Sequence, residues 1–207
     1  MKRQWFTPLV LSAVVLAAFA LASDRAPVSA EDAPGYVSQR NCKKCHFKTH
    51  RSWKKTTHAK AMDVLKPGEK ADVKTKFKLD PQKDYTKDPS CLACHATGYG
   101  LKGGYPVVKD GWSDAEVKLA KNNSGVGCET CHGPGEKYVP FKKDHETFKR
   151  PEVVALGMTV PVTADVCTKC HTAEGNPTAP DGYTFDFEAM MKKTEGIHEH
   201  IKLKHEH

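Results

Sequence analysis

The sequence predicts a mainly α-helical fold in which short, irregular helices and loops surround something other than an aliphatic core. Only 39% of the 207 residues are hydrophobic and 28% are charged, which leaves little apolar material for a conventional interior. Glycine and proline separate the helical stretches from one another. The third observation is a cysteine–histidine motif that occurs four times, and it indicates what fills the interior.

Each copy of the motif has the pattern C-x-x-C-H, and the four copies use all eight cysteines. The copies are Cys42, Cys45 and His46; Cys91, Cys94 and His95; Cys128, Cys131 and His132; and Cys167, Cys170 and His171. Two thiols at i and i+3 can each add to one vinyl group of a haem, and the adjacent histidine then becomes the proximal iron ligand. Zinc sites and a thioredoxin-like motif are the alternatives, but neither requires a histidine after every second cysteine. We therefore expect four covalently attached haem c groups.

The N-terminus has the features of a secretory signal. Lys2 and Arg3 form a charged start, and Leu9–Ala22 is an apolar run of 14 residues, short for a membrane span. An uncleaved membrane anchor is the alternative interpretation. Export agrees with the cysteines, because thioether attachment takes place outside the bacterial cytoplasm. We therefore expect a periplasmic protein, with an extracellular location as the alternative.

The domain boundaries follow from the cleavage site. Small residues occupy the positions before two candidate sites, which end at Ala22 and at Ala30. We prefer the second site, which makes Glu31 the mature start. The prediction is then a signal peptide over residues 1–30 and one tetrahaem cytochrome c domain over residues 31–207.

The formal net charge of +7 overstates the basic character of the mature chain. Residues 1–30 account for +2 of it, which leaves +5 for residues 31–207. Four haems add about −8 through their propionates and about +4 through ferric iron, so the oxidised holoprotein is near neutral. This weakens the interpretation of the lysines as a nucleic-acid-binding surface, and we expect no nucleic-acid partner. We expect the lysines to solvate the protein, to neutralise propionates or to steer a redox partner, with membrane contact only peripheral.

Local patterns predict the secondary structure in chain order. A helix is expected over Cys42–Leu65, ended by Lys66-Pro67-Gly68. Ser113 and Glu116 form a capping box that opens a helix reaching about Lys121. The other expected elements are a polar connector over 66–90 with one helical turn at 70–78, a short strand at 105–108, a helix at 141–149 that stops before Pro151, a helix capped by Thr163 that carries the fourth motif, and an amphipathic helix over 186–204.

The sixth position of each iron decides what a haem can do, and apolar helix faces indicate its ligands. The faces are His58 with Met62 and Leu65; His145 with Phe141 and Phe148; and His198 with Phe187, Met191 and Ile201. We expect His58, His145 and His198 as second iron ligands, against the alternative of buried core histidines. Three such histidines for four irons leave one haem five-coordinate or completed from elsewhere.

The remaining candidates are poorer. His50 follows the first proximal histidine by one turn and therefore lies on the proximal side of its own haem. His205 and His207 lie at the end of the expected last helix. Met62 and Met158 can ligate iron, but methionine more often serves packing.

Eight short runs occur in the order in which they occur in a known family. They are Thr57–Met62, Lys78–Pro81, Lys83–Thr86, Lys102–Tyr105, Gly125–Glu129, His132–Gly135, Tyr183–Phe185 and His198–His200. On these residues the sequence resembles the tetrahaem cytochrome c-554 family, electron carriers of ammonia-oxidising bacteria. The segment 172–182 and the tail after His200 are shorter than in that family.

The resemblance implies a mainly helical periplasmic protein with closely stacked haem pairs. It implies His58, His145 and His198 as distal ligands and no sixth protein ligand at the haem of His95. It also implies that electrons come from hydroxylamine oxidoreductase and pass towards the quinone pool through membrane cytochromes. Reduction of nitric oxide at the open haem has been proposed for the family.

We expect an electron carrier rather than an enzyme, with electrons passing through four haems between redox partner proteins. The sequence contains no catalytic cluster beside the haem motifs. One alternative is a reductase of nitric oxide or another nitrogen oxide at a five-coordinate haem. The other is a subunit of an extracellular cytochrome filament, in which a neighbouring subunit supplies the missing ligand. The oligomeric state is left open.

Overall fold

The structure, a computed structural model, describes residues 33–193 and 196–201. From Pro34 onwards the described residues belong to one unit. The expected signal peptide over 1–30, with both cleavage sites, lies outside the described residues, as do His205 and His207. Across the described part of the chain, no helix combines the length and the apolar character that a membrane span requires.

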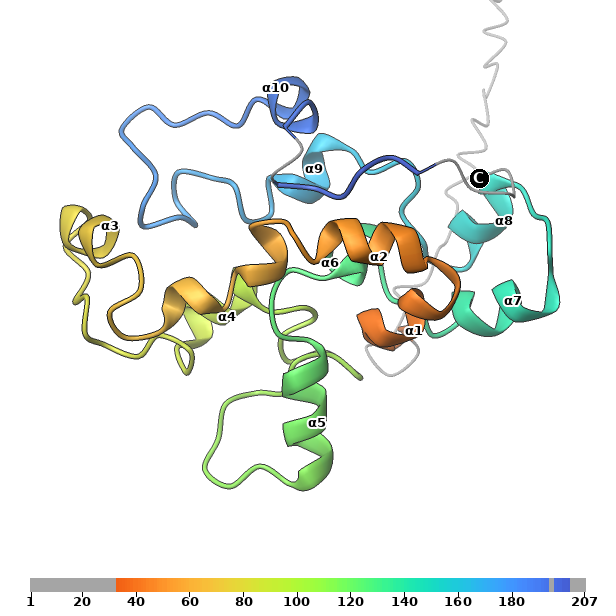
Figure 1. Ribbon diagram of the computed structural model, residues 1–207, viewed down its shortest axis with the longest axis horizontal. Coiled ribbons are helices and arrows are strands. Elements are labelled where there is room, and N and C mark those ends of the chain that lie inside the picture. Colours follow the sequence, from red (N-terminus) through yellow and green to blue (C-terminus); the bar gives the residue numbers. More distant parts are fainter. Residues whose placement is uncertain (1–32, 194–195, 202–207) are drawn as a thin grey trace, which may run out of the picture. The chain divides into compact units, whose positions relative to one another are not determined.

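Short helices and loops make up the described chain, which confirms the mainly α fold class (Figure 1). The helices are α1 (Gln39–Cys45), α2 (Phe47–Trp53), η1 (His58–Lys60), η2 (Asp63–Leu65), α3 (Ala71–Lys76), α4 (Pro89–His95), α5 (Asp114–Asn122), α6 (Cys128–His132), α7 (Tyr138–Asp144), α8 (Arg150–Ala155), α9 (Ala164–Cys167) and α10 (Phe187–Met191). Within the described residues, β structure is limited to isolated bridges from Ala96 to Ser124 and Gly125.

The single helix expected over Cys42–Leu65 is wrong, because four short elements replace it. His46 ends α1 with φ −106° and ψ 47°, outside the helical region. After α2, the Thr56 hydroxyl donates to the Trp53 carbonyl oxygen at 2.8 Å, and such a side-chain bond competes with helix propagation. The helical turn expected at 70–78 is present as α3.

Two of the haem motifs form compact helices of their own. In α4 the Asp88 carboxylate accepts the Ser90 N–H at 3.0 Å, and Pro89 occupies the first turn, where its missing N–H costs nothing. Helix α6 contains the third motif and begins after Gly127. The second and third histidines therefore sit at the last residue of a short helix, directly after their cysteines.

The segment around α5 gives one confirmed and one wrong expectation. Ser113 and Glu116 form the expected capping box, with the Ser113 hydroxyl accepting the Glu116 N–H at 3.3 Å. Residues 105–108 form no strand. The Tyr105 N–H donates to the Thr97 carbonyl at 2.9 Å, and the Tyr105 carbonyl accepts the Gly100 N–H at 2.8 Å. Both backbone groups of Tyr105 therefore form hydrogen bonds within a local loop and not with a neighbouring strand.

The C-terminal helices are shorter than expected. Helix α7 ends at Asp144, and Pro151 lies in the first turn of α8 rather than after a helix. Thr163 precedes α9, which ends at Cys167 and therefore carries only the start of the fourth motif. The long helix over 186–204 is wrong, because α10 ends at Met191 and His198 lies in a non-helical segment beyond Gly196.

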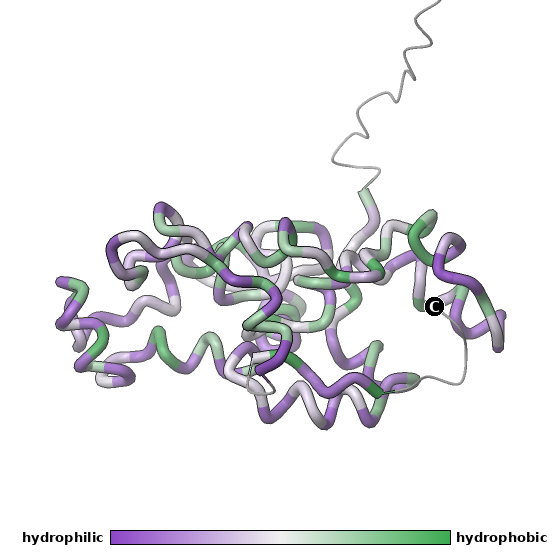
Figure 2. The backbone as a smooth tube through the Cα atoms, turned by 90° about the horizontal axis from the view of Figure 1, so that it is seen from above, coloured by the Kyte–Doolittle hydropathy of each residue, from purple (hydrophilic) through white to green (hydrophobic). Residues whose placement is uncertain are grey.

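In the described residues two small apolar clusters take the place of a single large core, and hydrophilic and hydrophobic stretches are interspersed along the coloured part of the tube in Figure 2. Met62, Leu65 and Leu92 belong to the first cluster, where Leu92 is completely buried. Tyr138 and Phe148 belong to the second cluster. Such limited burial agrees with an interior completed by groups other than side chains.

A buried hydrogen-bond junction ties the second motif to the third. Thr97, two residues after His95, donates its hydroxyl hydrogen to the Gly125 carbonyl and accepts the Gly127 N–H, both at 2.8 Å. Gly125 has φ +82°, and a Cβ there would lie 2.7 Å from the Ala59 carbonyl oxygen. The Trp53 indole N–H donates to the Val126 carbonyl at 2.9 Å, which joins α2 to the same junction.

Candidate haem-binding site

The eight cysteines of the four motifs are all free of disulfides, as attachment to vinyl groups requires. The motifs are not evenly spread. Cys42 of the first motif lies within hydrogen-bond reach of Cys128 of the third, and Cys94 of the second lies within reach of Cys170 of the fourth. The fold therefore brings together motifs that are far apart in the sequence, in the combinations first with third and second with fourth.

Thiol pairing also affects the acidity of the unattached cysteines. The hydrogen bond from Cys170 lowers the pKa of Cys94 to about 7 and raises that of Cys170 itself. Burial raises the pKa of Cys131 to about 11. A thiol with a pKa near 7 is partly thiolate at neutral pH, and the thiolate is the nucleophilic form. Cys94 is therefore favoured over Cys170 and Cys131 as the thiol that attacks a vinyl group.

Two pairs of histidines face one another at the separation expected across an iron. The ring centroids of His58 and His171 are 6.0 Å apart, and those of His132 and His198 are 6.1 Å apart. Two metal–nitrogen bonds of about 2 Å each, plus the distance from each nitrogen to its ring centre, give roughly 6 Å for trans imidazole ligands. The residues present therefore fit a bis-histidine haem at each pair.

Backbone carbonyls fix the tautomers of several of these histidines. Nδ1 of His95 lies 2.6 Å from the carbonyl oxygen of Ala61, and Nδ1 of His132 lies 3.2 Å from the carbonyl oxygen of Thr159. His198 makes the same contact with its neighbour Glu199 at 2.9 Å. A carbonyl can only accept, so Nδ1 carries the proton and the Nε2 lone pair is available to a metal.

Burial favours the neutral form of His58, His132 and His171. Desolvation lowers the pKa of His58, and it also lowers that of His132, with the nearby His198 as a smaller cause. Desolvation, followed by the neighbouring His58, lowers the pKa of His171. The same ring of His171 stacks on Phe185, with centroids 5.0 Å apart. Neutral, oriented imidazoles are the form that binds iron.

The third expected distal ligand is placed differently. His145 is exposed, stacks on Phe141 with centroids 4.1 Å apart and points Nδ1 at the Phe141 carbonyl at 2.9 Å. Nε2 of His46 lies 3.0 Å from the Tyr138 hydroxyl. The structure thus places Tyr138 against His46, and His145 as a distal iron ligand stays a prediction.

The second motif has no such partner within the described chain. Among the described residues, no imidazole faces His95 as His58 faces His171. Met62, considered as a ligand, is buried in the first apolar cluster. Met158 packs against the second cluster. Both methionines therefore serve packing in this structure.

Some residues of the site could not be found from the sequence. Tyr138, Phe185 and the carbonyls of Ala61 and Thr159 contact histidines from distant segments. Glu129 is a further example, since it is only 2% exposed although it lies inside a motif. No local pattern marks a residue whose role depends on which loop folds over it.

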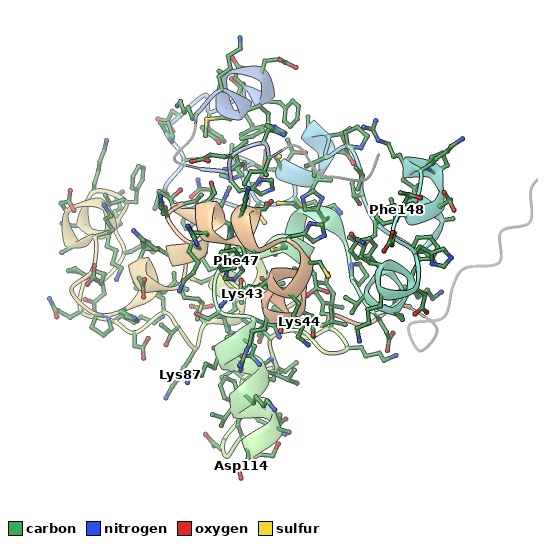
Figure 3. All side chains as sticks on the ribbon, turned by 45° about the vertical axis from the view of Figure 1, so that its right-hand side comes forward. Lys43, Lys44, Phe47, Lys87, Asp114 and Phe148 are labelled. Carbon is green, nitrogen blue, oxygen red and sulfur yellow. The ribbon has the colours of Figure 1, made fainter. Side chains whose placement is uncertain are left out.

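A basic groove of about 1340 Å³ lies beside the first motif. Its walls come from α1, the end of α2, η1 and α5, and Figure 3 shows Lys43 and Lys44 on α1. The lining contains no carboxylate among the described residues. Its cationic side chains are Arg40, Lys43, Lys44, Lys54, Lys60, Lys118 and Lys121. Such a surface attracts acidic partners.

Known proteins share both the sequence and the fold. A family profile described as cytochrome c554 and c-prime matches residues 41–133. Cytochrome c-554 of Nitrosomonas europaea is 37% identical over 213 aligned residues, covering 92% of this chain and 85% of the relative. The solved reduced state of cytochrome c554 from Nitrosomonas europaea matches with a TM-score of 0.69 and 35% identity, over 83% of this chain and 88% of that one.

The helical frame, the attachment motifs and these matches together define a multihaem c-type cytochrome, an electron carrier with four haem c groups. The identity extends over nearly the whole of both chains. The chain therefore belongs to the cytochrome c-554 family.

Proposed function

We propose that each C-x-x-C-H motif attaches one haem and that the protein carries electrons between periplasmic redox partners. The histidine pairs support this proposal most directly, because 6.0 and 6.1 Å between ring centroids suit two imidazoles on one iron. When bound, a haem supplies a one-electron ferric–ferrous couple. In this assignment His171 and His58 would hold one haem iron, and His132 and His198 would hold another.

The chain's own residues keep the redox geometry fixed. Backbone carbonyls of Ala61 and Thr159 orient His95 and His132, so a change in iron charge does not rotate the ligand. Thr97 keeps the second and third motifs in register through two buried hydrogen bonds. A rigid ligand set lowers the reorganisation that accompanies each electron transfer.

Closeness of the motifs favours two haem pairs. Cys42 lies beside Cys128, and Cys94 lies beside Cys170, so haems attached there start from neighbouring points. Cys167 is close enough to Cys131 to raise the pKa of the Cys131 thiol. These contacts support stacking of the first haem with the third and of the second with the fourth, with a link between the third and the fourth.

The location and the partners follow from the chemistry of attachment and from the surface. Thioether formation outside the cytoplasm and the signal-like residues 1–30 support export to the periplasm. The basic groove supports an acidic donor or acceptor, and a hydroxylamine oxidoreductase-like protein is the donor class that family membership favours.

The test is a count of haems and of their spin states in the purified holoprotein. Mass spectrometry is expected to give four covalent haems, and Cys167→Ala with Cys170→Ala is expected to give three. His198→Ala is expected to convert one low-spin haem to a high-spin haem in electron paramagnetic resonance spectra. His200→Ala is the matched control, because His200 lies two residues away in the same segment and is exposed.

Two outcomes contradict the proposal. A wild-type protein with fewer than four haems contradicts attachment at every motif. An unchanged low-spin count in His198→Ala, with four haems still bound, contradicts the pairing of His198 with His132.

A further inference from the structure

Glu129 is a buried carboxylate held entirely by backbone donors. Its side chain belongs to α6 and is 2% exposed. One oxygen, Oε1, accepts the Val37 N–H at 2.9 Å and the Gly135 N–H at 2.8 Å. The other, Oε2, accepts the Ser38 N–H at 2.8 Å. Burial is the larger effect and raises the pKa of Glu129, whereas the three N–H donors that converge on the carboxylate lower it and favour the charged form.

Within the described residues, no lysine or arginine forms an ion pair with this carboxylate; the recorded ion pairs involve other acids. The charge of Glu129 acts on three neighbouring titratable groups, Tyr36 and the thiols of Cys42 and Cys128, and it favours the protonated form of each. Tyr36 stays neutral at neutral pH, and Cys42 loses its proton when a thioether forms. The negative charge of Glu129 is therefore not compensated locally by side chains.

The position of Glu129 makes two haem attachment sites its neighbours. It follows Cys128 directly, and Cys128 lies within hydrogen-bond reach of Cys42. Glu129 thus lies beside the first and the third motifs. Cys94 and Cys170, which belong to the other two motifs, pair with each other instead.

We propose that Glu129 sets the reduction potentials of the first and third haems, keeping both lower than they would be beside a neutral residue. A ferric haem carries one more positive charge than a ferrous haem, so a nearby buried anion stabilises the oxidised form. The low dielectric of the surroundings makes the interaction stronger than at the surface. The inference rests on the haem attachment proposed above.

Glu136 offers a matched control. Its carboxylate accepts the Gly35 N–H at 2.7 Å, so both glutamates hold residues 35–38, the lead-in segment before the first motif. It differs in being exposed and in pairing with Lys102 at 2.9 Å, so its charge is screened. Glu129→Gln and Glu136→Gln therefore both weaken the clamp on the lead-in segment, and only the first removes a buried charge.

The experiment is a spectroelectrochemical titration of the four-haem holoprotein. Glu129→Gln is expected to raise two of the four potentials by about 59 mV, a tenfold change in each one-electron equilibrium constant. Glu136→Gln is expected to change the one-electron equilibrium constant of each haem by less than about threefold. Glu129→Asp, which keeps the charge, is expected to stay close to wild type.

Three results overturn the inference. Glu129→Gln with four haems and unshifted potentials shows that the carboxylate does not set them. Equal shifts in Glu129→Gln and Glu136→Gln assign the effect to the lead-in segment. Loss of haems in Glu129→Gln alone assigns the carboxylate to assembly of the fold. A wild-type protein with fewer than four haems, in contrast, contradicts the proposed function itself.

Discussion

Thr97→Val should destabilise the junction between the second and third haem motifs without leaving a cavity. Valine has the shape of threonine but lacks the hydroxyl, so the buried Gly125 carbonyl and Gly127 N–H both lose their partner. Each unsatisfied buried group costs about 1–3 kcal/mol. The expected loss is about 3 kcal/mol in the free energy of unfolding, or about 6–12 °C in Tm for a chain of this size.

The assay is urea unfolding of the four-haem holoprotein, followed by far-ultraviolet circular dichroism. Thr130→Val is the control, because its hydroxyl makes one long bond of 3.3 Å to the Thr97 hydroxyl. It is expected to cost less than about 1 kcal/mol. A loss below about 0.5 kcal/mol in Thr97→Val, with an unchanged m-value, would refute the junction as a stabilising element.

Two further predictions concern reactivity and docking. Before haem attachment, the rate at which iodoacetamide alkylates Cys94 should rise steeply as the pH passes about 7, because the thiolate forms above the pKa of the thiol. Cys131, with a pKa of about 11, should stay unreactive. Equal alkylation rates of the two cysteines at pH 8 would contradict the pairing of Cys94 with Cys170. Lys54→Glu with Lys121→Glu should slow reduction by an acidic donor about tenfold at low salt, while Lys87→Glu, outside the groove, should change the rate less than twofold in stopped-flow measurements. An equal slowing in Lys87→Glu and in the double variant would contradict docking at the groove.

The attachment chemistry could be predicted from the sequence because it is local. Cysteines at i and i+3 with a following histidine carry the information within five residues, wherever that segment lies. Capping at Ser113 and the turn at 70–78 are local in the same sense, and both are present. The resemblance to the cytochrome c-554 family also rested on short runs, and the comparisons confirm it.

Predictions that depended on long helices were wrong. The expected helix over 186–204 was the basis for placing His198 on an apolar face, yet α10 ends at Met191. His198 nevertheless faces His132, although it lies in a non-helical stretch of the described chain. In a chain with so little apolar core, short helices depend on neighbouring loops more than on intrinsic propensity.

The sequence by itself determined the mainly helical class and the four haem c groups, and it predicts the proximal histidines, because each depends on residues adjacent in the chain. Only the tertiary structure decided that Cys42 meets Cys128, that His58 meets His171, and that Glu129 is buried beside two motifs. Such contacts join segments separated by many residues. They are fixed by the hydrogen bonds and packing of the folded chain, for which no local pattern exists.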